Sequence, residues 1–153
     1  LFCCRYRLGR GAEIVPTPFH DAANGVANLY WRNDGDRSFT SAGEETGLVS
    51  SDTRYSFIGL WEDFNDDNLI DLYVINDFGP NNLYINTGSG FEDRAAEMGI
   101  LDASTGMGIS GADIDLDGDL DFYVTNIFIN IFFNNFVKFF IIKFFLSGNR
   151  YSK

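Results

Sequence analysis

Residues 70–75 and 120–125 share one alternating pattern, in which every second position is an apolar Ile, Leu, Phe or Val side chain. Alternation with a period of two, built from β-branched and aromatic residues, is typical of a strand with two different faces. Four further short runs of apolar or small residues predict strands, and these cover residues 56–61, 82–86, 91–95 and 107–112. No stretch before residue 127 has a helical period, so the sequence predicts an all-β protein.

The strand pattern recurs with a period of roughly 50 residues. Asn28-Leu29-Tyr30 returns as Asn82-Leu83-Tyr84, and the acidic stretch Asp63–Val74 returns as Asp113–Val124. Self-similarity at such a period indicates that each repeat is one supersecondary unit. Four short strands joined by tight turns are the blade of a β-propeller. We therefore predict a partial propeller with about two four-stranded blades.

The repeat divides the chain into five parts. Residues 1–24 are an unassigned N-terminal segment, residues 25–50 hold the last strands of one blade, and residues 51–101 form a complete blade. Residues 102–128 open the next blade, and residues 129–153 form an anomalous apolar tail. A propeller closes with about four to eight blades. We expect about two blades to leave unpaired strand edges, and the chain to be a fragment of a longer protein.

Two acidic loops join the first two strands of consecutive repeats. Oxygen-bearing side chains stand at positions 1, 3, 5 and 9 of each loop, and position 7 can offer its backbone carbonyl. Carboxylates crowded so closely repel one another unless a hard cation neutralises them, and Ca²⁺ takes six to eight oxygen ligands. The predicted ligands are Asp63, Asn65, Asp67, the Leu69 carbonyl and Asp71 in one loop, and Asp113, Asp115, Asp117, the Asp119 carbonyl and Asp121 in the other.

Position 6 of each loop favours a left-handed backbone. Gly118 has this freedom because it lacks a Cβ, and Asn68 is among the residues that best tolerate a positive φ. An EF-hand would need a bidentate Glu at position 12 between two helices. That position is Val74 or Val124 here, between predicted strands, so we exclude an EF-hand. Ordinary solvated turns rich in Asp remain the alternative to a calcium site.

The composition sharpens the picture. The 153 residues include 22 Asp and Glu against 11 Lys and Arg, which gives a formal net charge of −11. Nucleic-acid binding needs a basic face, so no nucleic-acid partner is expected. Nine of the 16 Asp residues lie in the two loops, so the acidity is concentrated in the predicted ligands. The adjacent Cys3 and Cys4 form no disulfide framework, and Leu1–Arg10 contains no signal peptide.

The loops and their flanking strands resemble FG-GAP repeats, also called VCBS-type repeats, of the kind that build integrin α-subunit propellers. The resemblance is carried by the D-x-[DN]-x-D-[GN]-x-x-D loops and covers about residues 14–128. It is closest to the subset with a C-terminal ASPIC and UnbV domain, which includes the cartilage acidic protein-like proteins. The stretches that carry this closer likeness are Val15–Gly25, Tyr55–Asn65, Asn76–Asn86 and Ala95–Asn126.

The resemblance implies an extracellular or cell-surface propeller that binds Ca²⁺, has a binding or structural role and is not an enzyme. Its expected partner is a protein or carbohydrate ligand. The sequence departs from the family in having few blades, no ASPIC and UnbV domain within the chain, and Asn68 in place of Gly. A hydrolase that uses Asp residues of the acidic loops is the alternative from another class. Repetition of the same Asp cluster favours a structural ion, because acid–base carboxylates need different environments.

Two further polar residues, His20 and Asp77, lie outside the acidic loops. His20 lies between Phe19 and Asp21, but no Ser or Cys nucleophile motif accompanies it, so we predict a structural histidine. Asp77 lies between the end of a predicted strand and a Gly-Pro pair, so we predict that it forms a turn. No catalytic or cofactor-binding residue is predicted.

Residues 127–146 have a different composition, since 18 of these 20 positions are Phe, Ile, Asn or Lys, the residues with AT-rich codons. The segment is long enough for a membrane helix, but Lys138 and Lys143 within it are costly. It is too long, and lacks the alternation, for a core strand. We hypothesise a retained intron or gene-model error between about Phe128 and Leu146. A membrane anchor, which would make the chain a surface protein, and an unusual genuine segment are the alternatives.

Overall fold

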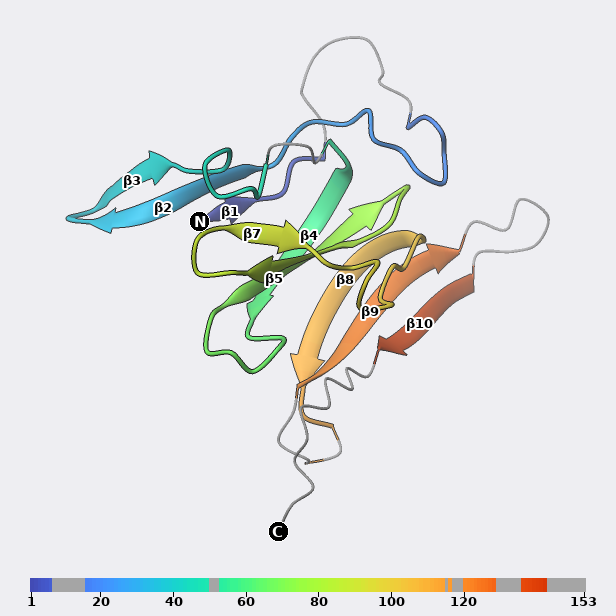
Figure 1. Ribbon diagram of the computed structural model, residues 1–153. Coiled ribbons are helices and arrows are strands. Elements are labelled where there is room, and N and C mark those ends of the chain that lie inside the picture. The colour runs from blue at the N-terminus through green and yellow to red at the C-terminus, as the bar shows by residue number, and fades with distance from the viewer. Residues whose placement is uncertain (7–15, 50–52, 115, 117–119, 129–135, 143–153) are drawn as a thin grey trace.

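The described part of the chain folds into three antiparallel sheets, as the computed structural model shows (Figure 1). The structure describes residues 1–6, 16–49, 53–114, 116, 120–128 and 136–142. Its strands are β1 (Phe2–Cys3), β2 (Leu29–Gly35), β3 (Ser38–Ser41), β4 (Tyr55–Glu62), β5 (Asp71–Asp77), β6 (Asn82–Asn86), β7 (Phe91–Asp93), β8 (Thr105–Ala112), β9 (Asp121–Phe128) and β10 (Phe136–Ile142). The described residues contain no helix, so the all-β prediction is confirmed.

The middle sheet is a four-stranded meander in the order β4-β5-β6-β7. Strand β5 lies inside it and is buried on both faces, because its alternating side chains enter two different apolar clusters. Tyr73 and Ile75 belong to one cluster, and Leu72 and Val74 to the other. A near-continuous apolar strand such as β5 is typical of a sheet covered on both sides.

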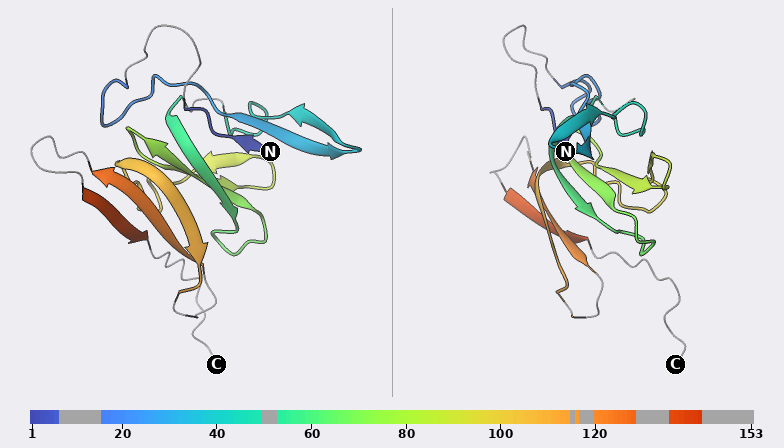
Figure 2. Two further views of the ribbon diagram at one scale, coloured as in Figure 1. Left: turned by 180° about the vertical axis from the view of Figure 1, so that it is seen from behind. Right: turned by 90° about the vertical axis from the view of Figure 1, so that its left-hand side faces the viewer.

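The other two sheets cover these two faces (Figure 2). On one face, Tyr73 and Ile75 pack with Phe122 and Val124 of β9. On the other face, the β5 side chains pack with Leu48 and with residues of the first sheet. Since each cluster contains side chains from two sheets, burial of apolar area holds neighbouring sheets together. This arrangement of successive small sheets is the one expected of consecutive propeller blades.

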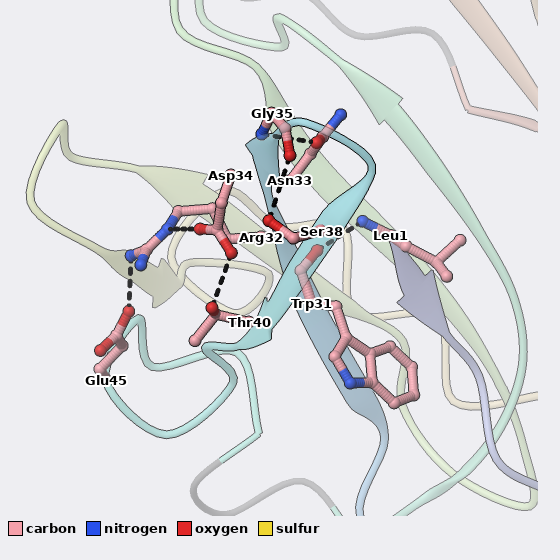
Figure 3. A network of polar contacts seen from close by, with 9 residues as sticks. All are labelled: Leu1, Trp31, Arg32, Asn33, Asp34, Gly35, Ser38, Thr40 and Glu45. Atoms are coloured by element: carbon pink, nitrogen blue, oxygen red, sulfur yellow. Dashed lines mark hydrogen bonds and ion pairs between the residues drawn. The ribbon is translucent and has the colours of Figure 1, made fainter.

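The first sheet, in the order β1-β2-β3, includes a strand from the N-terminal segment that the sequence left unassigned. The Leu1 ammonium donates to the Trp31 carbonyl at 2.7 Å, and the Trp31 N–H donates back to the Leu1 carbonyl at 2.8 Å (Figure 3). Arg32 bridges Asp34 at 3.2 Å and Glu45 at 2.7 Å on the outside of the hairpin. These ion pairs are exposed, so solvent screens them and they contribute little to stability.

The third sheet, in the order β10-β9-β8, contains a strand in the apolar tail. Strand β10 pairs with β9 in antiparallel register, from Phe136↔Phe128 to Ile142↔Phe122. The 20-residue segment is predicted to be too long, and to lack the alternation, for a single core strand, and the structure has a strand of seven residues within it. Within the described part of the chain, no helix has the length and apolar character that a membrane span requires. The rest of the tail lies outside the described residues, and the intron hypothesis stays a prediction.

Candidate metal centre

The first acidic loop connects β4 to β5 and turns through two left-handed residues. Asp66 has φ 59° and Asn68 has φ 67°. Asn68 thus adopts the conformation expected at position 6, although it is not glycine. Asn and Asp are several-fold enriched in this region of backbone space, which explains why the loop tolerates both residues.

The side chains at positions 1, 3 and 5 fold back onto the backbone of the loop itself. The Asn68 N–H donates to Asp63 Oδ2 at 2.8 Å, and the Leu69 N–H donates to Asp67 Oδ1 at 2.7 Å. The Asp67 N–H donates to Asn65 Oδ1 at 3.1 Å. Such Asx contacts stabilise a tight turn. The side chains of alternate positions are therefore held by the backbone N–H groups of the loop.

Asp71, at position 9, anchors the loop to the sheet. Its side chain is fully buried, with Oδ2 accepting the Phe64 N–H at 3.0 Å and Oδ1 accepting the Asn86 N–H at 2.7 Å. Burial raises the pKa of Asp71, the two backbone N–H groups lower it, and the nearby charges of Asp67 and Asp63 raise it further. The loop therefore concentrates negative charge that a cation would relieve.

The second acidic loop, between β8 and β9, repeats this anchor. The Ile114 N–H donates to Asp121 Oδ2 at 3.0 Å, the counterpart of the Phe64 bond. Leu116, at loop position 4, has φ 62°, close to the 59° of Asp66 at the same position of the first loop. Asp113 lies at the start of the loop. The remaining predicted ligands, Asp115, Asp117 and Asp119, lie outside the described residues.

The donor set of the first loop matches a hard cation in its chemistry. Three carboxylates, one carboxamide and one backbone carbonyl supply only oxygen, which is what Ca²⁺ prefers. In the part of the chain that the structure describes, no three His, Cys, Asp or Glu side chains are grouped as they would be around a metal ion. The loop thus has the conformation of a hydrogen-bonded Asx turn, and ion binding would require its carboxylates to turn from backbone N–H groups toward the ion.

The comparison with protein families identifies this region. Residues 63–124 match the model of the FG-GAP-like repeat. The match begins at the first predicted ligand of the first loop and ends inside β9, so it spans both loops and the strands between them. The match confirms the predicted resemblance to FG-GAP repeats over these residues. The closer likeness to the subset with an ASPIC and UnbV domain stays a prediction. This repeat points to a binding or scaffolding module of β-propeller type. The search of curated proteins gave no match.

The structure corrects the role of Asp77. The sequence predicts a turn former, but Asp77 is the last residue of β5 and is 3% exposed. Its carboxylate accepts the Tyr6 hydroxyl at 2.7 Å. Alternation along β5 was the available signal, because Asp77 shares a face with the buried Tyr73 and Ile75.

Proposed function

We propose that this chain is a calcium-stabilised binding or scaffolding module of β-propeller type that works outside the cell or at its surface. One observation carries the calcium proposal. Asp71 and Asp121 anchor two loops of the same residue pattern in the same way, 50 residues apart. Two loops with one oxygen-rich pattern at the period of the repeat are what a structural ion in each repeat would require.

In the first loop, the side chains of Asp63, Asn65, Asp67 and Asp71 and the Leu69 carbonyl would hold the ion. The bound Ca²⁺ would supply charge neutralisation and would tie the loop between β4 and β5. Burial and the charges of two neighbouring carboxylates raise the pKa of Asp71, which supports a need for such a counter-charge. The proposed role of the ion is structural, and we propose that the protein is a binding module rather than an enzyme.

The decisive experiment is a thermal melt of the full chain with Ca²⁺, with Mg²⁺ and with EDTA. A ligand that binds only the folded state stabilises it by about 2.7 kcal/mol at a hundredfold excess over its dissociation constant. We expect Ca²⁺ to raise the melting temperature and Asp67→Asn to reduce that increase. Asp36→Asn is the matched control, because Asp36 also lies in a turn at positive φ but outside both loops. A melting curve that does not respond to Ca²⁺ contradicts the calcium proposal.

The hydrolase alternative makes a different prediction for single substitutions. If both loops hold structural ions, Asp67→Asn and Asp117→Asn should reduce stability by similar amounts, because the two residues occupy the same loop position. The two losses should also add, because substitutions at separate sites act independently. A hydrolase would instead lose its activity through one of them while the fold remains intact. Measuring both variants and the double variant by chemical denaturation distinguishes the two functions.

A further inference from the structure

A second polar site lies at the end of the β4–β5 hairpin away from the acidic loop. Glu62 pairs with Asp71 beside the loop, whereas Tyr55 pairs with Asp77 at the other end. At about 3.3 Å per residue, the length of β5 separates the two ends by roughly 20 Å. The site around Asp77 is therefore independent of the predicted metal ligands.

Asp77 is a buried carboxylate with one oxygen unused. Oδ2 accepts the Tyr6 hydroxyl, while Oδ1 is buried and has no hydrogen-bond partner among the residues that the structure describes. Burial raises the pKa of Asp77, and the hydrogen bonds from Tyr6 and from the Phe78 backbone lower it. A buried acceptor without a donor is costly, so an incoming donor would be favourable here.

The Tyr6 ring, whose hydroxyl binds this carboxylate, belongs to a cluster of aromatic rings. The Tyr6 ring lies 5.7 Å from Tyr55 and 6.1 Å from Phe57, measured between centroids. The Tyr55 ring in turn lies 5.7 Å from Phe78. Phe57 is the extra residue where the β4–β5 register shifts between Ser56 and Ile58. A bulge of this kind re-aims a side chain, and bulges are over-represented beside binding sites.

The aromatic surface is open to solvent. Tyr6 is 39% exposed, Phe19 42% and Phe57 48%. Phe19 extends the surface, because its ring lies 4.9 Å from that of Phe78. Grouped exposed aromatic side chains are typical of an interaction surface rather than of scattered surface residues.

The backbone at this site is strained. Phe78 has φ 60°, and a bulky side chain in the left-handed region is a genuine outlier. The Ala22 N–H donates to the Phe78 carbonyl at 2.8 Å and holds the residue in place. Strain of this kind persists where the surrounding structure enforces it, and it clusters at binding sites.

We propose that this surface, formed by Tyr6, Phe19, Phe57 and Phe78 beside the buried Tyr55 and Asp77, binds a basic side chain of a protein partner. The faces of aromatic rings attract an ammonium or guanidinium group, and the unused Asp77 oxygen accepts one of its N–H donors. The Asp77 carboxylate, rather than the distant acidic loops, supplies the charge complementarity with a basic group. Arg54 on the rim is paired with Asp21 at 2.8 Å, and His20 stacks edge-on against Phe19.

This inference names the partner chemistry of the proposed binding role and rests on it. The test is an NMR titration of the full chain, in Ca²⁺-containing buffer, with N-acetyl-lysine methylamide and N-acetyl-arginine methylamide. N-acetyl-norleucine methylamide, which has no charge, is the matched probe. We expect saturable shifts at the Asp77 and Phe78 amides with a basic probe and none with the neutral one. Absence of saturable shifts with either basic probe overturns the proposal.

Variants locate the binding. Asp77→Asn and Phe57→Ala should each lower the affinity for the basic probe by about tenfold. A loss of that size corresponds to one cation–π or charge contact. Phe39→Ala is the control, because Phe39 is 53% exposed on β3, away from the site. Equal binding by Asp77→Asn, Phe57→Ala and Phe39→Ala overturns the assignment. A negative result for the basic probes would not affect the dependence of melting on Ca²⁺. The proposed surface and the proposed calcium site can therefore be refuted separately.

Discussion

Asp71 and Asp121 make the same hydrogen bond in consecutive repeats. Each carboxylate accepts a backbone N–H from seven residues upstream, Phe64 for Asp71 and Ile114 for Asp121, at 3.0 Å in both cases. The bond closes the acidic loop onto the first residue of the following strand. The sequence repeat is therefore also a structural one, and in this structure position 9 of each loop ties the loop to the start of the following strand.

The buried Asp71 should be the most sensitive position of the first loop. In Asp71→Ala, the Phe64 and Asn86 N–H groups lose their acceptor, and two such losses cost about 2–4 kcal/mol in the free energy of unfolding. Urea denaturation in EDTA checks this without any contribution from a bound ion. Glu44→Ala, an exposed acidic control, should change stability by about 0.5 kcal/mol or less. Equal losses in both variants would contradict the anchoring role.

Ser56 should be essential to a buried polar chain. Asn28 donates to Ser56 Oγ at 2.8 Å, and the Ser56 hydroxyl donates to Asn76 Oδ1 at 2.8 Å. Ser56→Ala leaves a donor and an acceptor unsatisfied, so we expect a loss of about 2–4 kcal/mol, measured by denaturation. Thr40→Ala removes an exposed hydroxyl of the first hairpin and should cost clearly less. A loss of stability in Ser56→Ala no larger than that in Thr40→Ala would contradict the role of Ser56 in this polar chain.

Gly106 should not tolerate a side chain. A Cβ at this position would lie 2.2 Å from Ile75 Cγ2, between the middle and third sheets. Gly106→Ala should therefore destabilise the protein by about 1–3 kcal/mol through overpacking. Ser110→Ala, an exposed position of the same strand, is the control for the measured melting temperatures. Unchanged stability in Gly106→Ala would mean that the two sheets do not pack as described.

Asp77 should make stability depend on pH. Burial raises its folded pKa above the ordinary 3.8, so the folded state keeps the proton where the unfolded chain has lost it. The contribution of Asp77 is then fully present below pH 3.8 and is lost as the pH rises through the folded pKa. We expect the free energy of unfolding of the wild type, relative to Asp77→Asn, to fall between acid and neutral pH. If the difference in free energy of unfolding between the wild type and Asp77→Asn stays constant or rises with pH, the predicted effect of Asp77 is contradicted.

Much of the fold follows from local patterns. Alternation at residues 70–75 and 120–125 predicted strands that the structure contains as β5 and β9, because side chains two residues apart lie on the same face of a strand. The two acidic loops were predicted from the spacing of their oxygens, and Asn68 adopts the expected positive φ. Residues close in sequence determine these features, so the sequence alone predicts them.

The sequence by itself thus determined the all-β class and the likeness to an FG-GAP-like repeat, and it placed the oxygen-bearing side chains at alternate positions of each acidic loop. Only the tertiary structure decided which groups meet across the chain. The Tyr6 hydroxyl reaches Asp77 over a separation of 71 residues, and β1 pairs with β2 from a segment without a strand pattern. The physical reason is that hydrogen bonds and ring contacts between distant segments depend on how the sheets pack, which no local periodicity encodes.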